Sequence, residues 1–556
     1  MAFQVSPGVQ VKEIDASGVI PAVSTSIGGF AGSFNWGPVE EVRTVGSETE
    51  LASIFGKPDS NTYKYFLTAA SFLKYGNALK VVRAKSGHLN AADGTAKLIK
   101  NRDHFETGEI THDGTFVARY PGKLGNSLKV VICPADATAW AAFTQADSFD
   151  GQPGTSDTAT LYEHTKDELH VAVVDTDGSW SGTAGTVLET FQFVSQASDS
   201  VKSDGQSNYY KEVINRTSRY VYSTGHPPTL TDCGEALATQ AAASTVYVTG
   251  TAAISVDLIN GTNDNVPTAG EIGTAFGLLA DAETIDVNLL FAYPDADGSK
   301  TIADKLIEIC EARKDCMAFV SPPIEDSVGT DTPAANVKTW ADTLPSTSYA
   351  ATDSGAVYVY DKYNDVYRWL GAAGLCAGLC ANTDDVADAW FSPAGVNRGQ
   401  LFGVTKLAYN PKKADRDTLY KARVNPLVSF PGQGTMLFGD KTLLSKPSAF
   451  DRINVRRLFI VLEKAVATAA KAQLFEFNDE FTRAQFRNML EPFMRDVKGR
   501  RGMTDFRVIC DTTNNTGQVI DANRFVADIF IKPSRSINFI TLNFIATRTG
   551  VDFSEI

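Results

Sequence analysis

Two cysteines at helical spacing are the first residues of this chain that could do chemistry. Cys376 and Cys380 lie in the segment GLCAGLCAN and would share one face of a helix. A reactive thiol pair is one interpretation. The other is a buried helix whose small residues permit close packing, and the apolar neighbours favour it.

Three glycines, Gly28, Gly29 and Gly32, lie in the segment SIGGFAGSF. A phosphate-binding loop needs the spacing GxGxxG, or GxxxxGK followed by Ser or Thr, and neither is present. Glycines within a strand allow another segment of the chain to approach closely. We therefore expect a buried strand here and no nucleotide site.

Asp295 and Asp297, in the segment PDADGS, could belong to a calcium loop or form a carboxylate pair. The calcium-loop signature fails when Asp295 is taken as the first ligand. Position six is then Lys300, where Gly is needed, and position twelve is Leu306, where Glu is needed. We expect a turn here, followed by a helix with its N-cap at Ser299.

Signatures of catalysis and of zinc binding are missing from the sequence. It contains no GxSxG, no HExxH and no SxxK followed by a lysine-rich partner motif. No histidine lies four residues from another or near a cysteine pair, as a zinc site would favour. The histidines are His88, His104, His112, His164, His170 and His226. We expect no catalytic residue, no metal ion and no cofactor.

Length and composition describe a large protein made of several domains. At 556 residues the chain is too long for one core, and its length predicts about three or four domains. No run of eighteen apolar residues could span a bilayer, and the N-terminus lacks a secretory signal. We expect neither membrane insertion nor secretion. The seven cysteines form an odd set without a CxxC pair, so we expect reduced, mostly buried thiols.

Charge is distributed unevenly along this chain of net charge −14. Residues 134–257 contain 16 acidic and 5 basic residues, whereas residues 441–501 contain 7 acidic and 13 basic ones. We expect the acidic region to lie outside and the basic region to face an acidic partner. Two solvated faces without special meaning are the alternative. Nucleic acid is a poor candidate for the partner, because aromatic residues are not interleaved with the basic ones.

The elements that position these residues predict a multidomain α/β (α+β) fold, with mixed sheets flanked by helices and extended arms at both ends. Residues 21–120 together with 258–400 predict an α/β middle domain. Residues 121–257 predict a β-rich, acidic insertion on the outer surface, because short apolar alternations are separated there by polar turns. Residues 1–20 predict an N-terminal arm that is too short to fold alone.

The C-terminal third carries the strongest helical signal. Residues 455–472 place apolar side chains three and four residues apart, and a second amphipathic helix follows, which Pro492 should kink or restart. We assign residues 401–535 to a C-terminal domain on the inner side. The second helix ends in a basic cluster, which consists of Arg495, Lys498, Arg500 and Arg501.

Two strand-like segments end the chain. Residues 525–531 and 537–546 are rich in Ile, Phe, Leu and Thr, and Pro533 separates them. An edge strand must be covered, blunted or shared. We expect the first segment to lie in a sheet of its own subunit. We expect residues 536–556 to form a C-terminal arm that is shared with another copy.

Several segments together resemble the tail sheath proteins of myovirus-type bacteriophages, which are related to the sheaths of other contractile injection machines. The segments are SPGVQVKEI, GGFAGSFNWGPVEEV, YPGKLGNSLKV, FGDKTL, NVRRLFIVLEKAV, EPFMRDVKGRRG and ADIFIKPSRSINFITLNF. The resemblance covers roughly residues 1–130 and 258–556. It leaves out the acidic insertion, which varies in this family and typically forms outer decoration.

The resemblance implies a structural protein and not an enzyme. Sheath subunits stack as six-membered rings around an inner tail tube, and contraction drives the tube through the host envelope for genome ejection. The implied partners are other copies of the chain, the tube protein, the baseplate and the tail terminator or neck proteins, without direct contact to nucleic acid. The implied place is the virion tail, with assembly in the host cytoplasm.

The resemblance also implies that both arms add strands to sheets of neighbouring subunits. The strand-exchange residues are then Val9, Val11, Ile537, Phe539, Ile540, Leu542 and Phe544. We expect the basic cluster to face the tube in the extended sheath and to release it on contraction. The alternatives are a sheath from an injection system without DNA and an α/β enzyme, which would need a concave pocket with convergent polar groups.

Overall fold

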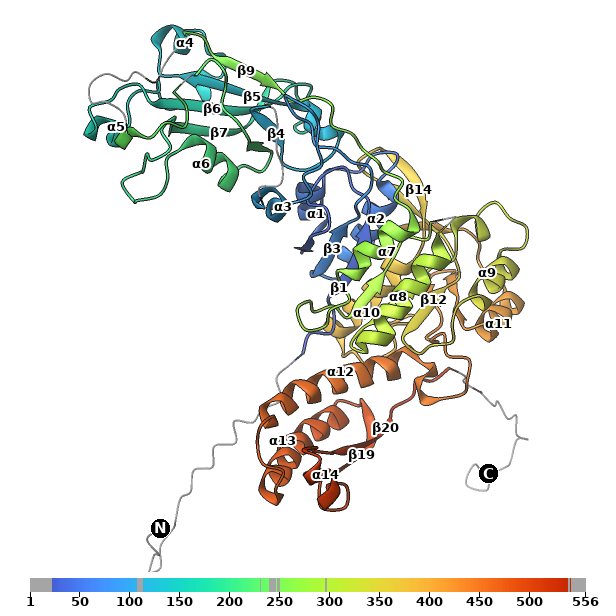
Figure 1. Ribbon diagram of the computed structural model, residues 1–556. Coiled ribbons are helices and arrows are strands. Elements are labelled where there is room, and N and C mark those ends of the chain that lie inside the picture. Colours follow the sequence, from blue (N-terminus) through green and yellow to red (C-terminus); the bar gives the residue numbers. More distant parts are fainter. Residues whose placement is uncertain are drawn as a thin grey trace, which may run out of the picture.

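The computed structural model describes residues 23–107, 114–230, 232–239, 247, 251–295, 298–538 and 541. Three parts follow one another along an elongated molecule (Figure 1). They are called the upper, middle and lower parts here, after their order in that view. The middle part touches both of the others, so its sheet sets their positions.

A seven-stranded sheet forms the middle part. Its strand order is β16-β12-β11-β10-β1-β3-β2, and every neighbouring pair is parallel except β2 with β3. The strands are β1 (Gly28–Gly32), β2 (Val42–Val45), β3 (Leu79–Arg83), β10 (Leu289–Phe291), β11 (Met317–Val320), β12 (Ala350–Asp353) and β16 (Val424–Asn425). β1, β10, β11 and β12 are buried along their whole length, as parallel strands covered on both faces must be.

Helices cover both faces of this sheet (Figure 1). α2 and α10 pack together over one face, and α7 and α8 form a pair on the other. The helices of the middle part are α1 (Glu48–Phe55), α2 (Tyr63–Leu73), α7 (Ala269–Gly277), α8 (Ser299–Arg313), α9 (Pro333–Asp342), α10 (Ala373–Val386) and α11 (Lys413–Lys421). The N-cap of α8 is Gly298, so the N-cap expected at Ser299 is wrong by one residue.

Close packing explains the glycines of β1 and the small residues of α10. A Cβ on Gly28 would lie 2.7 Å from the ring of Phe72 in α2, and one on Gly374 would lie 2.6 Å from the carbonyl oxygen of Thr68. α10 therefore needs small residues to lie against α2. All seven cysteines are buried free thiols, and burial raises the pKa of the Cys380 thiol to about 12. The packing interpretation of both segments is confirmed.

Smaller antiparallel sheets complete the middle part. They consist of β13 (Val357–Asp361), β14 (Val366–Leu370) and β15 (Val404–Leu407), and of β17 (Leu427–Phe430) with β18 (Gly434–Leu437). The domain border expected after residue 400 is wrong, because β15 pairs with β13 and β16 pairs with β12. These pairings join segments that are distant in the sequence, so no local pattern indicates them.

The upper part is built on a four-stranded antiparallel sheet in the order β7-β6-β5-β9, with the pair β4-β8 beside it. Its strands are β4 (Phe116–Ala118), β5 (Leu128–Pro134), β6 (Glu168–Asp175), β7 (Thr186–Ser195), β8 (Val221–Ser223) and β9 (Ile254–Asp257), and its helices are α3 (Arg102–Glu106), α4 (Ala137–Ala141), α5 (Asp157–Leu161) and α6 (Tyr210–Thr217). β4 precedes the expected start of the insertion at residue 121 but pairs with β8 inside it. This part therefore begins earlier than expected.

The lower part is a small α/β unit. It consists of α12 (Ile453–Ala470), α13 (Glu480–Gly499), β19 (Met503–Ile509), α14 (Gly517–Asp521) and β20 (Asp528–Pro533). The two expected amphipathic helices are confirmed. α13 runs through Pro492 without a break, so the restart expected there is wrong. Leu490 and Met494, on either side of Pro492, are buried in the core, and this packing holds the helix together.

A buried ion pair joins α12 to the middle part. The guanidinium of Arg457 lies 2.6 Å from the carboxylate of Asp384 in α10, and both side chains are less than one-tenth exposed. Arg457 also donates to the carbonyl oxygens of Cys380 and Thr25. Because Thr25 lies near the start of the described chain, one side chain connects the N-terminal segment, α10 and α12.

Arg457→Met leaves the Asp384 carboxylate buried without its cation. We expect the free energy of unfolding to fall by about 3–5 kcal/mol, the usual cost of breaking a buried pair. Urea unfolding followed by circular dichroism measures this change. Lys338→Met breaks the exposed pair with Asp342 and should cost less than about 1 kcal/mol. Equal losses in the two variants would contradict this role for Arg457.

Candidate assembly site

The lower part ends in a hairpin whose two outer edges carry no further strand within the described residues. β19 and β20 pair antiparallel, from Met503 with Pro533 to Ile509 with Asp528. β20 confirms that the first of the two terminal strand segments belongs to a sheet of its own subunit. A two-stranded ribbon is only marginally stable by itself in water. Each edge is therefore a place where another strand can add.

The two faces of the hairpin differ. The inner face packs on the core formed by α12 and α13 with Phe506, Val508, Ile529 and Ile531. On the outer face, Phe530 is 57% exposed. This alternation fixes the register, because a slip of one residue would expose the apolar set. A strand that adds at either edge meets a support that is already ordered.

Most of the expected strand-exchange residues lie outside the described residues. These are Val9, Val11, Phe539, Ile540, Leu542 and Phe544. Ile537 is described, and it lies beyond the end of β20 with 82% of its surface exposed. The expected strand from residue 537 onward is thus not formed at Ile537 in the single chain.

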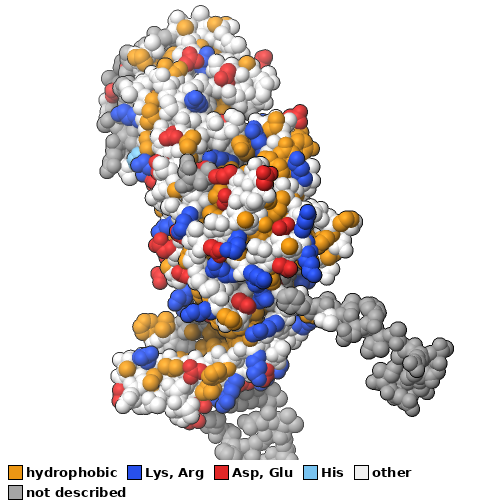
Figure 2. Space-filling view, turned by 90° about the vertical axis from the view of Figure 1, so that its right-hand side faces the viewer, with side chains coloured by type: hydrophobic (Ala, Val, Ile, Leu, Met, Phe, Trp, Pro, Cys, Tyr) orange, Lys and Arg blue, Asp and Glu red, His pale blue; other side chains and the backbone are white. Residues whose placement is uncertain are grey.

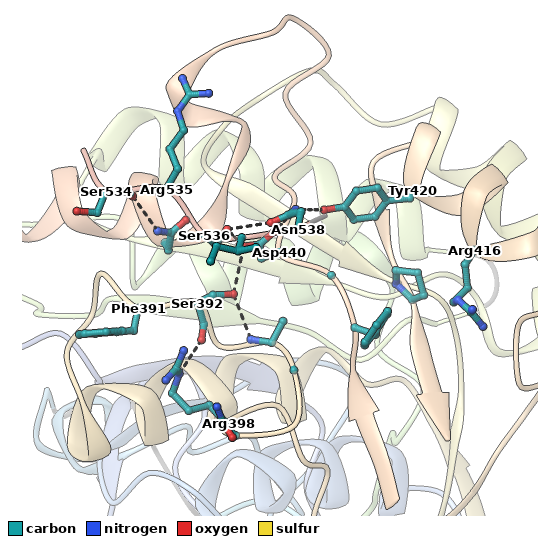
Figure 3. Close-up of a pocket in the computed structure, with 18 of the residues that line it drawn as sticks. Phe391, Ser392, Arg398, Arg416, Tyr420, Asp440, Ser534, Arg535, Ser536 and Asn538 are labelled. Carbon is teal, nitrogen blue, oxygen red and sulfur yellow. Dashed lines mark hydrogen bonds between the residues drawn. The ribbon is translucent and has the colours of Figure 1, made fainter. Parts of the chain in front are cut away.

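Asp440 anchors the chain where it leaves the lower part (Figure 3). Its carboxylate accepts hydrogen bonds from the hydroxyls of Ser392 and Ser536, at 3.1 and 2.6 Å, and from the side-chain amide of Asn538 at 3.4 Å. The Asn538 amide also donates to the Tyr420 hydroxyl at 2.6 Å. Burial raises the pKa of Tyr420 to about 12, so this hydroxyl stays neutral. The chain after β20 therefore returns to the middle part.

A cavity of about 880 Å³ lies beside this anchor, between the middle and lower parts. Figure 2 shows hydrophobic side chains in the hollow between these parts, with Lys and Arg side chains around it. The apolar lining includes Trp390, Phe391, Pro426 and Phe438. The charged lining has five cations and two carboxylates, namely Arg398, Lys413, Arg416, Arg501, Arg535, Asp417 and Asp440. The guanidinium of Arg535 extends away from Asp440 (Figure 3).

Carboxylates of the same chain neutralise most of the basic cluster. The pairs are Arg495–Glu491 at 2.8 Å, Lys498–Asp505 at 3.0 Å and Arg500–Asp496 at 3.6 Å, and Arg500 also pairs with Asp388. Arg501 lines the cavity. The excess of basic residues in 441–501 therefore overstates the positive charge of this surface. Asp388 and Asp505, which pair with the cluster, lie outside that segment of the sequence.

The carboxyl ends of the parallel strands, where α/β enzymes place their sites, are covered here. Asp353, at the end of β12, is 2% exposed and accepts a hydrogen bond from the Ser321 hydroxyl. The Ser321 oxygen in turn accepts from the N–H of Ala373 at the start of α10. Burial raises the pKa of Asp353 to about 7. These groups hold α10 to the sheet.

The other candidate ligand residues have structural partners. Asp295 pairs with Lys64 at 3.0 Å and accepts a hydrogen bond from Tyr65, whereas Asp297 lies outside the described residues. No group of three or more His, Cys, Asp or Glu side chains in the described ranges could hold a metal ion. No helix among them is long and apolar enough to cross a bilayer.

Three family models match this chain and together cover more than half of it. They are the tail sheath protein Gp18 domain III N-terminal region at residues 25–84, the phage tail sheath protein central domain at residues 274–443, and the phage tail sheath C-terminal domain at residues 445–547. The border between the last two separates the middle part from α12. It agrees with the sheet pairing and not with a border after residue 400.

Full-length relatives carry the same description. The chain is 34% identical to the tail sheath protein of Enterobacteria phage T4 and 33% identical to that of Vibrio phage KVP40, with 99% of both chains covered in each case. It is 32% identical to the tail sheath protein of Salmonella phage ViI, with 100% of this chain and 98% of the relative covered. None of the three family models matches residues 85–273, which include the acidic insertion, whereas the alignments to these relatives run along 99% to 100% of the chain.

Solved structures share the fold at low identity. The sheath tail protein of Listeria innocua superimposes with a TM-score of 0.53 at 11% identity, over 93% of this chain and 97% of that one. The sheath of an extracellular contractile injection system in its contracted state gives 0.51 at 12% identity, over all of both chains. The multidomain α/β fold is confirmed. The family models and the full-length relatives show that the chain belongs to the phage tail sheath protein family.

Proposed function

We propose that this chain is the structural subunit of a contractile tail sheath, without an enzymatic role. It polymerises as stacked six-membered rings around an inner tail tube and shortens to drive the tube through the host envelope. The observation that carries this proposal is the hairpin of β19 and β20. Within the described residues it has two open edges, one for each of the two expected terminal arms. The tail sheath proteins of the phages named above support it. In this proposal the chain is a component of the virion and assembles in the host cytoplasm.

Strand exchange is the proposed bond between copies. Each arm adds to one edge of the hairpin in another copy, so that a sheet is built from several chains. A backbone hydrogen bond contributes a net of about 0.5–1.5 kcal/mol, and several per arm give a contact of a few kcal/mol. Donor and acceptor surfaces differ, so the contact runs head to tail and repeats as a helical lattice.

The anchor at Asp440 supports a directed C-terminal arm. Ser536 and Asn538 are held on the middle part, so residues 539–556 start from a fixed point and not from the end of β20. The arm therefore starts on the middle part, whereas β20 belongs to the lower part, and the Arg457–Asp384 pair holds these two parts together.

The basic cluster is proposed to face the inner tube in the extended sheath. Arg495 and Lys498 hold their carboxylates in exposed pairs, which contribute little to stability. Exchanging these partners for carboxylates of the tube therefore costs little. On contraction the two side chains return to Glu491 and Asp505, and the tube is released.

A sheath from a contractile injection system without DNA is the second candidate. The solved sheath of an extracellular contractile injection system supports it only through the fold, at 12% identity. The full-length phage relatives, at 32% to 34% identity, favour a phage tail. Genes for a capsid and a terminase next to this gene would identify the phage, and their absence would identify the injection system.

The arms are tested by Val9→Asp/Val11→Asp and by deletion of residues 539–556. We expect each protein to fold, as judged by circular dichroism, but to form no long tubes, because the exchanged strand is lost or carries buried charge. Negative-stain microscopy counts the tubes. Gln10→Asp, on the opposite face of the same strand, is the control. Tubes at wild-type yield from both altered arms would contradict strand exchange.

Asp440→Ala removes the acceptor that holds Ser536 and Asn538. We expect the backbone amides of residues 534–538 to exchange hydrogen roughly tenfold faster or more, because a hydrogen bond to a charged group contributes about 1.5–3 kcal/mol. Hydrogen exchange with mass spectrometry measures this rate. Asp451→Ala, which removes a nearby carboxylate without contact to this segment, is the control. An unchanged exchange rate in Asp440→Ala would show that the anchor is not there.

The tube contact is tested with Arg495→Ala/Lys498→Ala. We expect the variant to need roughly tenfold more protein to cover purified inner tubes, since two charged contacts are lost. Sedimentation of tubes with bound sheath protein measures the coverage. Arg507→Ala, on the exposed face of β19, should behave like the wild type. The same loss in both variants, or in neither, argues against a tube-facing cluster.

A further inference from the structure

Four large apolar side chains project into solvent at the turn between α12 and α13. Leu474, Phe475, Phe477 and Phe481 are 62%, 104%, 84% and 75% exposed. Single exposed apolar residues are common, but four within eight residues form a patch of the kind that marks an interaction site. Residues 474–481 are called the aromatic loop here.

The aromatic loop is held in a fixed shape. Arg483 donates to both the side-chain and the backbone carbonyl oxygen of Asn478, and the Asp479 side chain accepts from the N–H of Thr482 at the start of α13. Phe475 has a φ of 71°, a left-handed conformation that bulky residues seldom adopt. Strained residues of this kind concentrate at functional positions. These contacts therefore hold the loop in a conformation that keeps its apolar side chains exposed.

The aromatic loop is acidic as well. Glu476, Asp479 and Glu480 stand between its apolar residues and are all exposed. A surface that receives this loop must offer apolar contacts within a basic rim, since an unpaired buried carboxylate would be costly.

The cavity between the middle and lower parts has these properties. Its apolar lining contains Trp390, Phe391, Pro426 and Phe438, and its charged lining has five cations against two carboxylates. One of these carboxylates, Asp440, already accepts hydrogen bonds from Ser392, Ser536 and Asn538. The net charge of the cavity lining is positive and complements the acidic residues of the aromatic loop. Its apolar side chains match the apolar residues of the loop.

Loop and cavity lie at opposite ends of α12. Asn454, at the start of α12, lines the cavity, whereas the loop begins just beyond the end of the helix at Ala470. A helix rises 1.5 Å per residue, so about 20 residues place the two surfaces about 30 Å apart. The loop of one copy therefore does not reach its own cavity.

We propose that the aromatic loop of one copy docks in the cavity of a second copy. Phenylalanine side chains of the loop contact the apolar lining of the cavity, and Glu476 and Glu480 pair with Lys413 and Arg416. The two surfaces differ, so the contact runs head to tail from copy to copy. The proposal rests on the sheath function and adds a side-chain contact to strand exchange between backbones.

Disulfide formation between two full-length variants tests the contact directly. One variant carries Phe477→Cys and the other Lys413→Cys, and the seven native cysteines are buried. After assembly of an equal mixture and mild oxidation, we expect a covalent dimer on a non-reducing gel, roughly tenfold more abundant than in either variant alone. Phe477→Cys mixed with Glu283→Cys, an exposed position on the middle part, is the control.

The outcomes separate this contact from the sheath function. Tubes without the covalent dimer would overturn the contact and leave the sheath function intact. A dimer without tubes would keep the contact and overturn the sheath lattice, and neither product would overturn both. A dimer of Lys413→Cys with Leu542→Cys in place of Phe477→Cys would mean that the C-terminal arm fills the cavity, and it would overturn the contact.

Reversing the charges on both surfaces distinguishes a lost contact from a variant that fails to fold. Glu476→Lys/Glu480→Lys and Lys413→Glu/Arg416→Glu should each slow tube formation by roughly tenfold, as followed by light scattering. All four substitutions in one chain should restore the wild-type rate, because the charges are again complementary. A chain with all four that is no faster than either pair alone would overturn the proposal, as would pairs that polymerise at the wild-type rate.

Discussion

Backbone hydrogen bonding imposes the constraint on which this protein depends. A two-stranded hairpin presents N–H and C=O groups along two edges, and in the described chain no third strand covers those of β19 and β20. The rest of the lower part presents this hairpin. α12 and α13 support its inner face, and Arg457 fixes α12 to the middle part through Asp384. The subunit thus offers an ordered acceptor, and the terminal segments are the proposed donors.

The junction between the middle and lower parts joins both ends of the described chain. Thr25 accepts a hydrogen bond from Arg457, and Asn538 is held by Asp440 and Tyr420. Thr25 and Asn538, from which the proposed arms continue, therefore both lie at the point where the two parts meet. In a lattice held together by such arms, each copy can turn as one body relative to its neighbours while the exchanged strands keep their pairing. Contraction then needs no strand to be broken.

Periodic signals predicted the local elements well, whereas pairings between distant segments could not be predicted. α12, α13 and β20 follow from apolar spacing, and the small residues of α10 follow from the segment GLCAGLC. β16 and β4 were assigned to the wrong parts, because their partners β12 and β8 lie far away in the sequence. Asp440 lies in the segment FGDKTL, but its partners come from other regions. The aromatic loop could have been predicted from the sequence, because three phenylalanines alternate there with acidic residues. It was missed because the segment lies between two strongly periodic helices.

Cryo-electron microscopy of tubes assembled from the full-length protein tests the central claim most directly. We expect a map in which the β19–β20 hairpin of each copy is flanked by two further strands, one from the N-terminal arm and one from the C-terminal arm of other copies. A hairpin that stays two-stranded in the assembled tube, or one that is completed by the arms of its own chain, would contradict strand exchange as the bond that builds this sheath.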